Sequence, residues 1–156
     1  MRLRAFTEVR TTACTIHHCT ATSQEHARDS WENLLFSVCR FYELTGHVPV
    51  NITVVSYEFK GRRFTDLHRA ALRYPQSHFR FIGTPALSPD AVQGEARAAS
   101  MFVTDPYSCR EELLAKKEER DPFAEGPYDG RCAPLTPLFD YCGDRVYQGP
   151  LPWAAS

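Results

Sequence analysis

The clearest repeat of apolar positions predicts a helix that ends at Gly46. Its apolar side chains recur at steps of three and four residues: Trp31, Leu34, Leu35, Val38, Cys39, Phe41 and Tyr42. This spacing gives a helix a wide apolar face, and glycine suits the left-handed position that follows a helix. Two starts fit the sequence: a capping box formed by Thr22 and Glu25, or capping by Asp29 and Ser30.

A strand, a second helix and a second strand are predicted next. Residues 51–57 (NITVVSY) are mostly β-branched or apolar, which is typical of a buried parallel strand. Residues 59–74 have amphipathic helical spacing and stop at Pro75, and residues 78–83 (HFRFIG) form the second strand. This order is a βαβ unit with a right-handed crossover, and it favours an α/β fold.

Two further helices are predicted downstream. The third opens at Ser88-Pro89-Asp90 and extends to about Phe102, with proline well placed in the first turn. The fourth extends from Tyr107 to about Arg120. Its charged run at residues 116–120 (KKEER) is interpreted as a solvated helix face.

The two ends of the chain are less regular. Residues 1–21 have two possible short strands, at 3–7 and 13–16, and are otherwise poorly defined. After residue 121 the chain is rich in proline, glycine and aromatic residues, which predicts mostly loop, with Leu151–Trp153 packed on the body. We therefore expect a single α/β domain over residues 22–156 with an irregular C-terminal tail.

Composition limits the class of protein. The chain has 156 residues, 43% hydrophobic and 24% charged, with a formal net charge of -1. A dedicated nucleic-acid binder is usually basic, so that class is disfavoured. No apolar run is long enough to span a membrane, and the N-terminus lacks the apolar core of a secretory signal. We expect a cytoplasmic protein of undefined oligomeric state.

The cysteines and histidines allow two readings. Six cysteines without a secretory signal indicate reduced thiols; Cys132 and Cys142 could pair, but free thiols are favoured. In the segment CTIHHC, Cys14, His17, His18 and Cys19 are zinc-ligand types. They lie within six residues and no second cysteine pair stands nearby, so an ordinary strand is favoured over a metal site.

Polar residues gather at two places where a ligand could bind. Ser56 lies near the end of the first predicted strand, and Lys60 and Arg63 open the following helix. Strand ends and helix starts favour anions, although a plain surface charge cluster is an equal alternative. Asp29, Ser30, Glu32 and Asn33 form the second group, at the start of the first helix, where capping is the simpler explanation.

No established catalytic motif is present, whether a P-loop, GxGxxG, HExxH or GxSxG. The histidines are scattered along the chain. We interpret His68 as a surface or helix-packing residue rather than a general base.

Two stretches resemble a known family. The helix start ARDSWENLLFS (27–37) resembles the motif S-x-(N/D)-(S/T)-x-E-N, and ITVVSYEFKGRRF (52–64) resembles V-T-S-x-(F/Y)-H-x-x-R. Both are motifs of the family called domain of unknown function 218, the SanA- and YdcF-like proteins, and the chain is most similar to its fungal branch. GEARAAS, DPYSC and the final LPW extend the likeness over residues 24–153.

The resemblance implies a Rossmann-like three-layer parallel sheet, incomplete at the N-terminal side. It also implies a small-molecule site, with S-adenosylmethionine as a possible ligand. The site candidates are then Asp29, Ser30, Glu32, Asn33, Ser56, Lys60 and Arg63. Ala27 replaces the family serine, Lys60 replaces its histidine, and the family's N-terminal Ser-Gly-Gly loop is not found here.

We therefore expect a protein that binds a nucleotide-like or anionic small molecule at strand ends, with its reaction undefined. The alternative is a truncated, non-catalytic remnant or interaction module. No nucleic-acid or membrane partner is expected.

Overall fold

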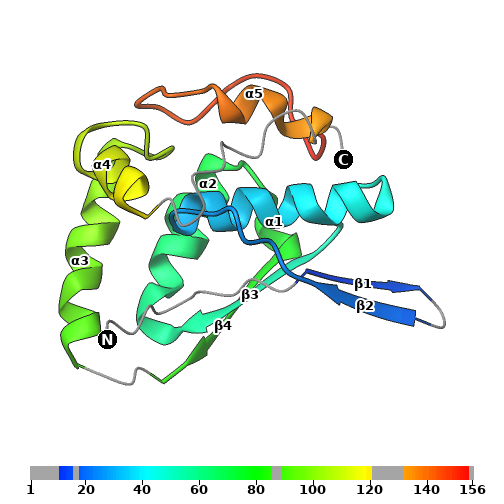
Figure 1. Cartoon of the computed structure of the whole chain (residues 1–156), viewed down its shortest axis with the longest axis horizontal. Helices are drawn as coiled ribbons and strands as arrows, with labels where there is room; N and C mark the ends of the chain where they lie inside the picture. Colours follow the sequence, from blue (N-terminus) through cyan, green and yellow to red (C-terminus); the bar gives the residue numbers. More distant parts are fainter. Residues whose placement is uncertain (1–10, 16–17, 86–88, 121–131, 155–156) are drawn as a thin grey trace.

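The structure, a computed structural model, describes residues 11–15, 18–85, 89–120 and 132–154. It is a mixed α/β fold (Figure 1), in which strands β3 (Ile52–Tyr57) and β4 (Phe79–Thr84) form a parallel two-stranded sheet. Strands β1 (Thr11–Thr15) and β2 (His18–Thr22) form a separate antiparallel hairpin. The predicted α/β class is confirmed.

Helix α1 (Ser30–Thr45) begins at the second of the two predicted starts. The Asp29 side chain accepts a hydrogen bond from the Glu32 amide at 2.8 Å, which satisfies one of the free N–H groups of the first turn. Thr22 is the last residue of β2, so the alternative start is excluded. At the other end Gly46 has φ 72°, and its amide donates to the Tyr42 carbonyl, as predicted for the C-terminal glycine.

The helix between β3 and β4 is irregular. It was predicted as one helix, and it comprises the 3₁₀ turn η1 (Glu58–Lys60), the π-helical turn η2 (Arg63–His68) and the short helix α2 (Arg69–Ala71). A 3₁₀ turn η3 (Gln76–His78) then leads into β4. Isolated π turns are rare and often lie at functional sites.

The parallel sheet is buried on one face only. Ile52 and Val54 of β3 are buried, whereas the alternate residue Val55 is 49% exposed and Ile82 of β4 is 39% exposed. The prediction of a fully buried strand is therefore wrong for this second face. Side chains alternate between faces along a strand, so a single layer of helices covers only every second residue.

The remaining helices are α3 (Pro89–Thr104), α4 (Glu111–Glu119), the 3₁₀ turn η4 (Ala133–Leu135) and α5 (Thr136–Phe139). The predicted third helix is confirmed. The fourth helix starts four residues later than predicted. The reason is Asp105, whose carboxylate accepts from the amides of Cys109 and Arg110 and holds residues 105–110 in a turn.

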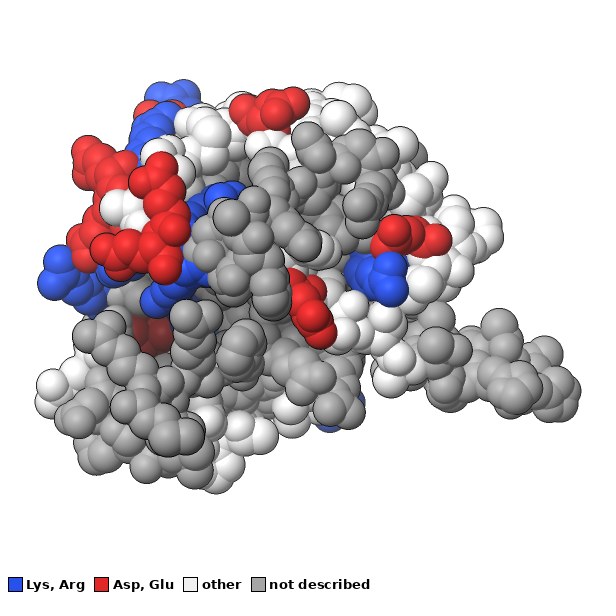
Figure 2. Space-filling view, viewed as in Figure 1, with Lys and Arg blue, Asp and Glu red and all other residues white. Residues whose placement is uncertain are grey.

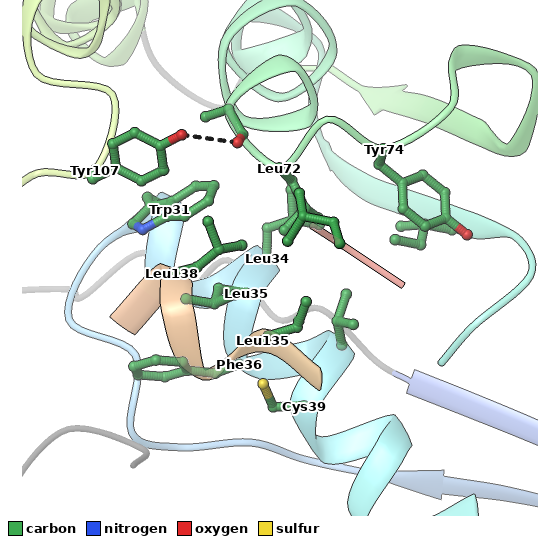
Figure 3. Packing of buried hydrophobic residues seen from close by; sticks show 14 of the residues in the cluster. Trp31, Leu34, Leu35, Phe36, Cys39, Leu72, Tyr74, Tyr107, Leu135 and Leu138 are labelled. Carbon is green, nitrogen blue, oxygen red and sulfur yellow. Dashed lines mark hydrogen bonds between the residues drawn. The ribbon is translucent and has the colours of Figure 1, made fainter. Parts of the chain in front are cut away.

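The core forms around α1. Leu135 of η4 and Leu138 of α5 pack against the apolar residues of α1 (Figure 3), and the Tyr107 hydroxyl donates to the Ala71 carbonyl at 3.0 Å. Leu151 and Trp153 are buried, as predicted for the C-terminal LPW. The Trp153 indole N–H donates to the Leu72 carbonyl, which fixes the end of the described chain to the helical segment after β3.

Four cysteines form two disulfides, Cys39–Cys132 and Cys109–Cys142. The prediction of free thiols is therefore wrong for these four residues. Chain folding brings together cysteines that lie far apart in sequence, and sequence spacing does not show this. Disulfides persist in oxidising compartments and are rare in the cytosol, so these two bonds count against the predicted cytoplasmic location.

Within the described ranges, no helix is both long and apolar enough to cross a membrane. In the hairpin, Cys14 lies opposite Cys19 in the backbone register. The other predicted strand, at residues 3–7, and His17 lie outside the described residues.

Candidate functional site

The first turn of α1 holds a buried ion pair. Glu32 accepts hydrogen bonds from the Arg28 backbone amide (2.9 Å), from Arg28 Nε (3.1 Å) and from Arg28 Nη2 (2.8 Å). Its neighbour Asp29 caps the helix with one carboxylate oxygen, and its other oxygen accepts from the Ser108 hydroxyl. Asp29 and Glu32, both predicted site residues, therefore take part in one network.

Lys117 of α4 completes this network. Its Nζ lies 3.1 Å from Glu32 Oε1 and 3.8 Å from Asp29 Oδ2, and the residue is only 6% exposed. The interpretation of the KKEER run as a solvated face is therefore wrong for Lys117. The surrounding glutamates do face solvent, and Figure 2 shows acidic side chains gathered over α4.

The two carboxylates of the network differ in their pKa shifts. Burial raises the pKa of Asp29, with only partial compensation from the charge of Lys117. Burial also acts to raise the pKa of Glu32, but hydrogen bonds from Arg28 and the charge of Lys117 together lower it below its usual value. Glu32 is thus held firmly as a carboxylate.

The second part of the site is a hydrogen bond between Ser30 and His68. Ser30 Oγ lies 2.8 Å from His68 Nε2, which joins the start of α1 to the π turn η2. His68 is fully buried, and its ring makes edge contacts with Phe64 and Phe102. Burial, aided by the positive charge of Arg63, holds the pKa of His68 well below its usual value, so its imidazole is neutral. His68 is therefore a helix-packing residue, one of the two roles predicted, and it also has a polar partner, Ser30, which was not predicted.

The third part of the site is an ion pair between η2 and α3. Arg63 Nη2 lies 3.0 Å from Glu95 Oε2, and both side chains are largely buried. Among the described residues, Arg63 Nε and Glu95 Oε1 are buried atoms with no hydrogen-bond partner. The Arg63 guanidinium lies over the ring of Phe102, the same ring that His68 contacts.

Lys60 lies beside this pair. Its Nζ is 5.5 Å from the Tyr57 ring centroid and 5.8 Å from that of Phe59. Burial, and then the positive charges of Arg63 and Arg120, lower the pKa of Lys60. The end of β3 is therefore a place where positive charges repel one another.

Of the seven predicted residues, Asp29 and Glu32 share the Lys117 network, Ser30 reaches η2 through His68, and the charge of Arg63 acts on Lys60. Helices α1 and α3 both contact η2, which follows β3 after the turn η1, and the charge of Asp29 acts on Arg63. Figure 1 shows α1 and α3 on either side of the helical segment that follows β3. For Ser56, the described contact is made by its backbone carbonyl, which accepts from the Thr84 hydroxyl. For Asn33 it is the backbone amide, which donates to the Asp29 carbonyl.

His68, Glu95 and Lys117 are not among the predicted site residues. For two of them a signal was present. His68 lies midway between Phe64 and Leu72 at steps of four, and Lys117 lies four residues after Leu113. Residues four apart share one face of a helix, so a polar residue aligned with buried apolar ones predicts a buried partner.

A cavity of about 210 Å³ adjoins the ion-pair network. Arg28, Glu32 and Lys117 contribute its charged lining, and Trp31 and Phe139 are among its apolar residues. As for metals, the described residues hold no group of three or more histidine, cysteine, aspartate or glutamate side chains able to bind one.

The chain is similar to an uncharacterised protein of Saccharomyces cerevisiae (strain ATCC 204508 / S288c), YOR238W, with 39% identity over 115 residues. The aligned region covers 65% of this chain and 38% of the yeast protein, so the chain spans less than half the length of that relative. No family model and no solved structure matches the chain.

Proposed function

We propose that this chain binds a nucleotide-like or other anionic small molecule beside the C-terminal end of β3. The supporting residues come from three places in the sequence: Ser30 from α1, Arg63 and His68 from η2, and Glu95 from α3. Polar groups from separate elements that meet in an otherwise apolar setting are the usual design of a ligand site.

The observation that carries this proposal is the pair of unsatisfied atoms on Arg63 and Glu95. Buried polar atoms normally have a hydrogen-bond partner, because leaving one unsatisfied costs about 1–3 kcal/mol. Within the described structure, Arg63 Nε is a buried donor and Glu95 Oε1 is a buried acceptor, each without a partner. A ligand with an anionic oxygen and a hydroxyl group would satisfy both.

S-adenosylmethionine, the ligand suggested by the family resemblance, meets this requirement. Its carboxylate would accept from Arg63, and a ribose hydroxyl would donate to Glu95. The proposal includes a Rossmann-like arrangement of the domain-of-unknown-function-218 type, in which ligands bind at the carboxyl ends of parallel strands. The parallel β3–β4 pair and the helical segment that follows β3 are consistent with that arrangement.

Isothermal titration and thermal-shift measurements with S-adenosylmethionine and a panel of nucleotides test this function. We expect saturable binding by the unchanged protein and its loss in Arg63→Met. The matched control is Arg62→Met, because Arg62 is the neighbouring arginine and is exposed. If no ligand of the panel binds, or if both variants bind like the unchanged protein, the proposal is wrong.

The second candidate is an interaction module without ligand binding. It is favoured by the apolar side chains of Val55 and Ile82 on the open face of the sheet. Light scattering on the purified protein, with and without Val55→Glu, separates the two. A monomer of unchanged mass that binds a panel ligand argues against the interaction module.

A further inference from the structure

We propose that the Ser30 hydroxyl donates a hydrogen bond to a phosphate monoester group of the ligand, with His68 fixed as the tautomer protonated at Nε2. This inference rests on the proposed function and narrows its ligand class to phosphate monoesters, so it favours nucleotides over S-adenosylmethionine. It assigns His68 as a positioning residue and Ser30 as a residue that determines specificity.

The surroundings of His68 determine which ring nitrogen carries the hydrogen. Nε2 lies 2.8 Å from Ser30 Oγ, whereas Nδ1 is buried and has no partner among the described residues. A neutral imidazole has one N–H and one lone pair. Buried N–H groups without a partner are rarer than buried acceptors without one. The hydrogen therefore belongs on Nε2, and the Nδ1 lone pair is left within the apolar contacts.

This tautomer makes Ser30 a hydrogen-bond donor. Because His68 Nε2–H donates to Ser30 Oγ, the serine hydroxyl hydrogen is left to point elsewhere. Ser30 lies in the first turn of the 16-residue helix α1, where the helix dipole favours an anion. A hydroxyl donor in this position is suited to an oxyanion.

The local charges suit an anion that can contact more than one positive group. The positive charges of Arg63 and Arg120 act on Lys60, and Glu95 is a carboxylate that acts on both Lys60 and Arg63. The nearby Asp29 is engaged by Ser108, by the cap of α1 and by Lys117. A phosphate monoester, with a charge of about −1.5 to −2 at pH 7 and three acceptor oxygens, can accept from Ser30 and Arg63 at once.

The π turn explains why these groups share one place. Arg63 and His68 are the first and last residues of η2, and both contact Phe102 of α3. The wider turn adds a residue to the helix and changes the direction of the side chains that follow it. Such turns are retained mostly where a site uses them.

The first experiment reads the tautomer directly in the unchanged protein. Nitrogen-15 NMR of the histidine side chains distinguishes a ring protonated at Nε2 from one protonated at Nδ1. We expect the His68 ring to be neutral and protonated at Nε2 at pH 7. A ring protonated at Nδ1 would overturn the proposal, because the Ser30 hydroxyl would then donate its hydrogen bond to His68 Nε2 and not to the ligand.

The second experiment measures preference for phosphate with two matched pairs: AMP against adenosine, and ribose 5-phosphate against ribose. We expect the phosphorylated member to bind more tightly, and Ser30→Ala to weaken it by about tenfold to a hundredfold, the usual effect of one hydrogen bond to a charged group. Ser30→Thr, which keeps the hydroxyl, should restore much of that loss. The control is Ser100→Ala, an exposed serine of α3.

His68 variants separate positioning from folding. His68→Gln keeps an N–H donor for Ser30 and should retain preference for the phosphorylated ligand, whereas His68→Met should lose it. If His68→Gln and His68→Met lose the preference for phosphate equally, and both melt like the unchanged protein, the positioning role of His68 is refuted. If phosphorylated and unphosphorylated ligands bind alike, or Ser30→Ala changes nothing, this inference fails while the proposed function stands. If no ligand of either kind binds, both fail.

Discussion

Replacement of Lys117 by methionine tests whether the buried ion pair stabilises the fold. The substitution keeps the apolar stem and removes the charge that lies 3.1 Å from Glu32 Oε1 and 3.8 Å from Asp29 Oδ2. Removing one partner of a buried pair typically costs 3–5 kcal/mol. Glu32 keeps its three hydrogen bonds from Arg28. We therefore expect the low end of that range, about 3 kcal/mol, or a melting temperature lower by about 6–12 °C.

The adjacent residue supplies the control. Lys116 also forms an ion pair, with Glu112 at 2.8 Å, but its side chain is 35% exposed. Exposed pairs contribute about 0–1 kcal/mol, so Lys116→Met should change the free energy of unfolding by no more than that. Urea unfolding at pH 7 measures both variants. A Lys117→Met variant within 1 kcal/mol of Lys116→Met would contradict the structural role of the buried lysine.

The pH dependence of the same variant gives a further check. The charge of Lys117 acts to lower the pKa of Asp29, against burial, which raises it. Without Lys117 the folded-state pKa of Asp29 rises further above its unfolded value. A carboxyl group of this kind favours the folded state at low pH and disfavours it as pH rises. The stability lost in Lys117→Met should therefore be smaller at pH 5 than at pH 7.

Three further outcomes are expected. Because the folded-state pKa of His68 is depressed, the free energy of unfolding should fall as pH drops below 6.5, by up to about 1.4 kcal/mol per pH unit. Denaturant titrations at pH 7.5, 6.5 and 5.5 should show a smaller pH dependence for His68→Gln. An unchanged pH dependence in that variant would refute the conclusion that His68 is buried as a neutral imidazole. Replacing both Cys39 and Cys132 with alanine removes a buried disulfide and should lower the free energy of unfolding by about 2–5 kcal/mol. Thermal unfolding under oxidising conditions compares this variant with the unchanged protein. An equal melting temperature would show that the bond does not stabilise the fold. Gly83→Ala should lower the free energy of unfolding by about 1–3 kcal/mol, because the added Cβ would lie 2.9 Å from the Glu58 Cα. In Gly94→Ala the added Cβ meets nothing within 4 Å, so this control should be neutral or stabilising by up to about 1 kcal/mol. Similar unfolding curves for the two variants would count against the close approach at Gly83.

The regular parts of the fold were predictable because their signals are local. The apolar repeat of α1, its cap at Asp29 and its terminal Gly46 all act within a few residues. The repeat and Gly46 lie where predicted, and Asp29 is one of the two starts that the sequence left open. The parallel pairing of β3 and β4 followed from the strand–helix–strand order. The extent of the sheet was less predictable, because a strand's neighbours depend on contacts between distant segments.

The pairing of side chains across elements was the least predictable part. The sequence separates Cys39 from Cys132 by 93 residues, and no spacing rule links them. Lys117 is surrounded in sequence by charged residues, and that context favoured a solvated position. Its burial depends on the carboxylates of Asp29 and Glu32 at the start of α1, which the local sequence pattern assigns to a cap or a ligand site.

The network around Lys117 also refines the role of the α1 motif. Asp29 and Glu32 are predicted ligand residues, yet their described hydrogen bonds are accepted from Arg28, Ser108 and the α1 backbone, and both form ion pairs with Lys117. These bonds hold the first turn of α1 rigidly in place. Ser30 lies in that same turn and faces His68 of the π turn instead. The acidic residues therefore position the turn, and under the proposed function Ser30, Arg63 and Glu95 are the residues that contact the ligand.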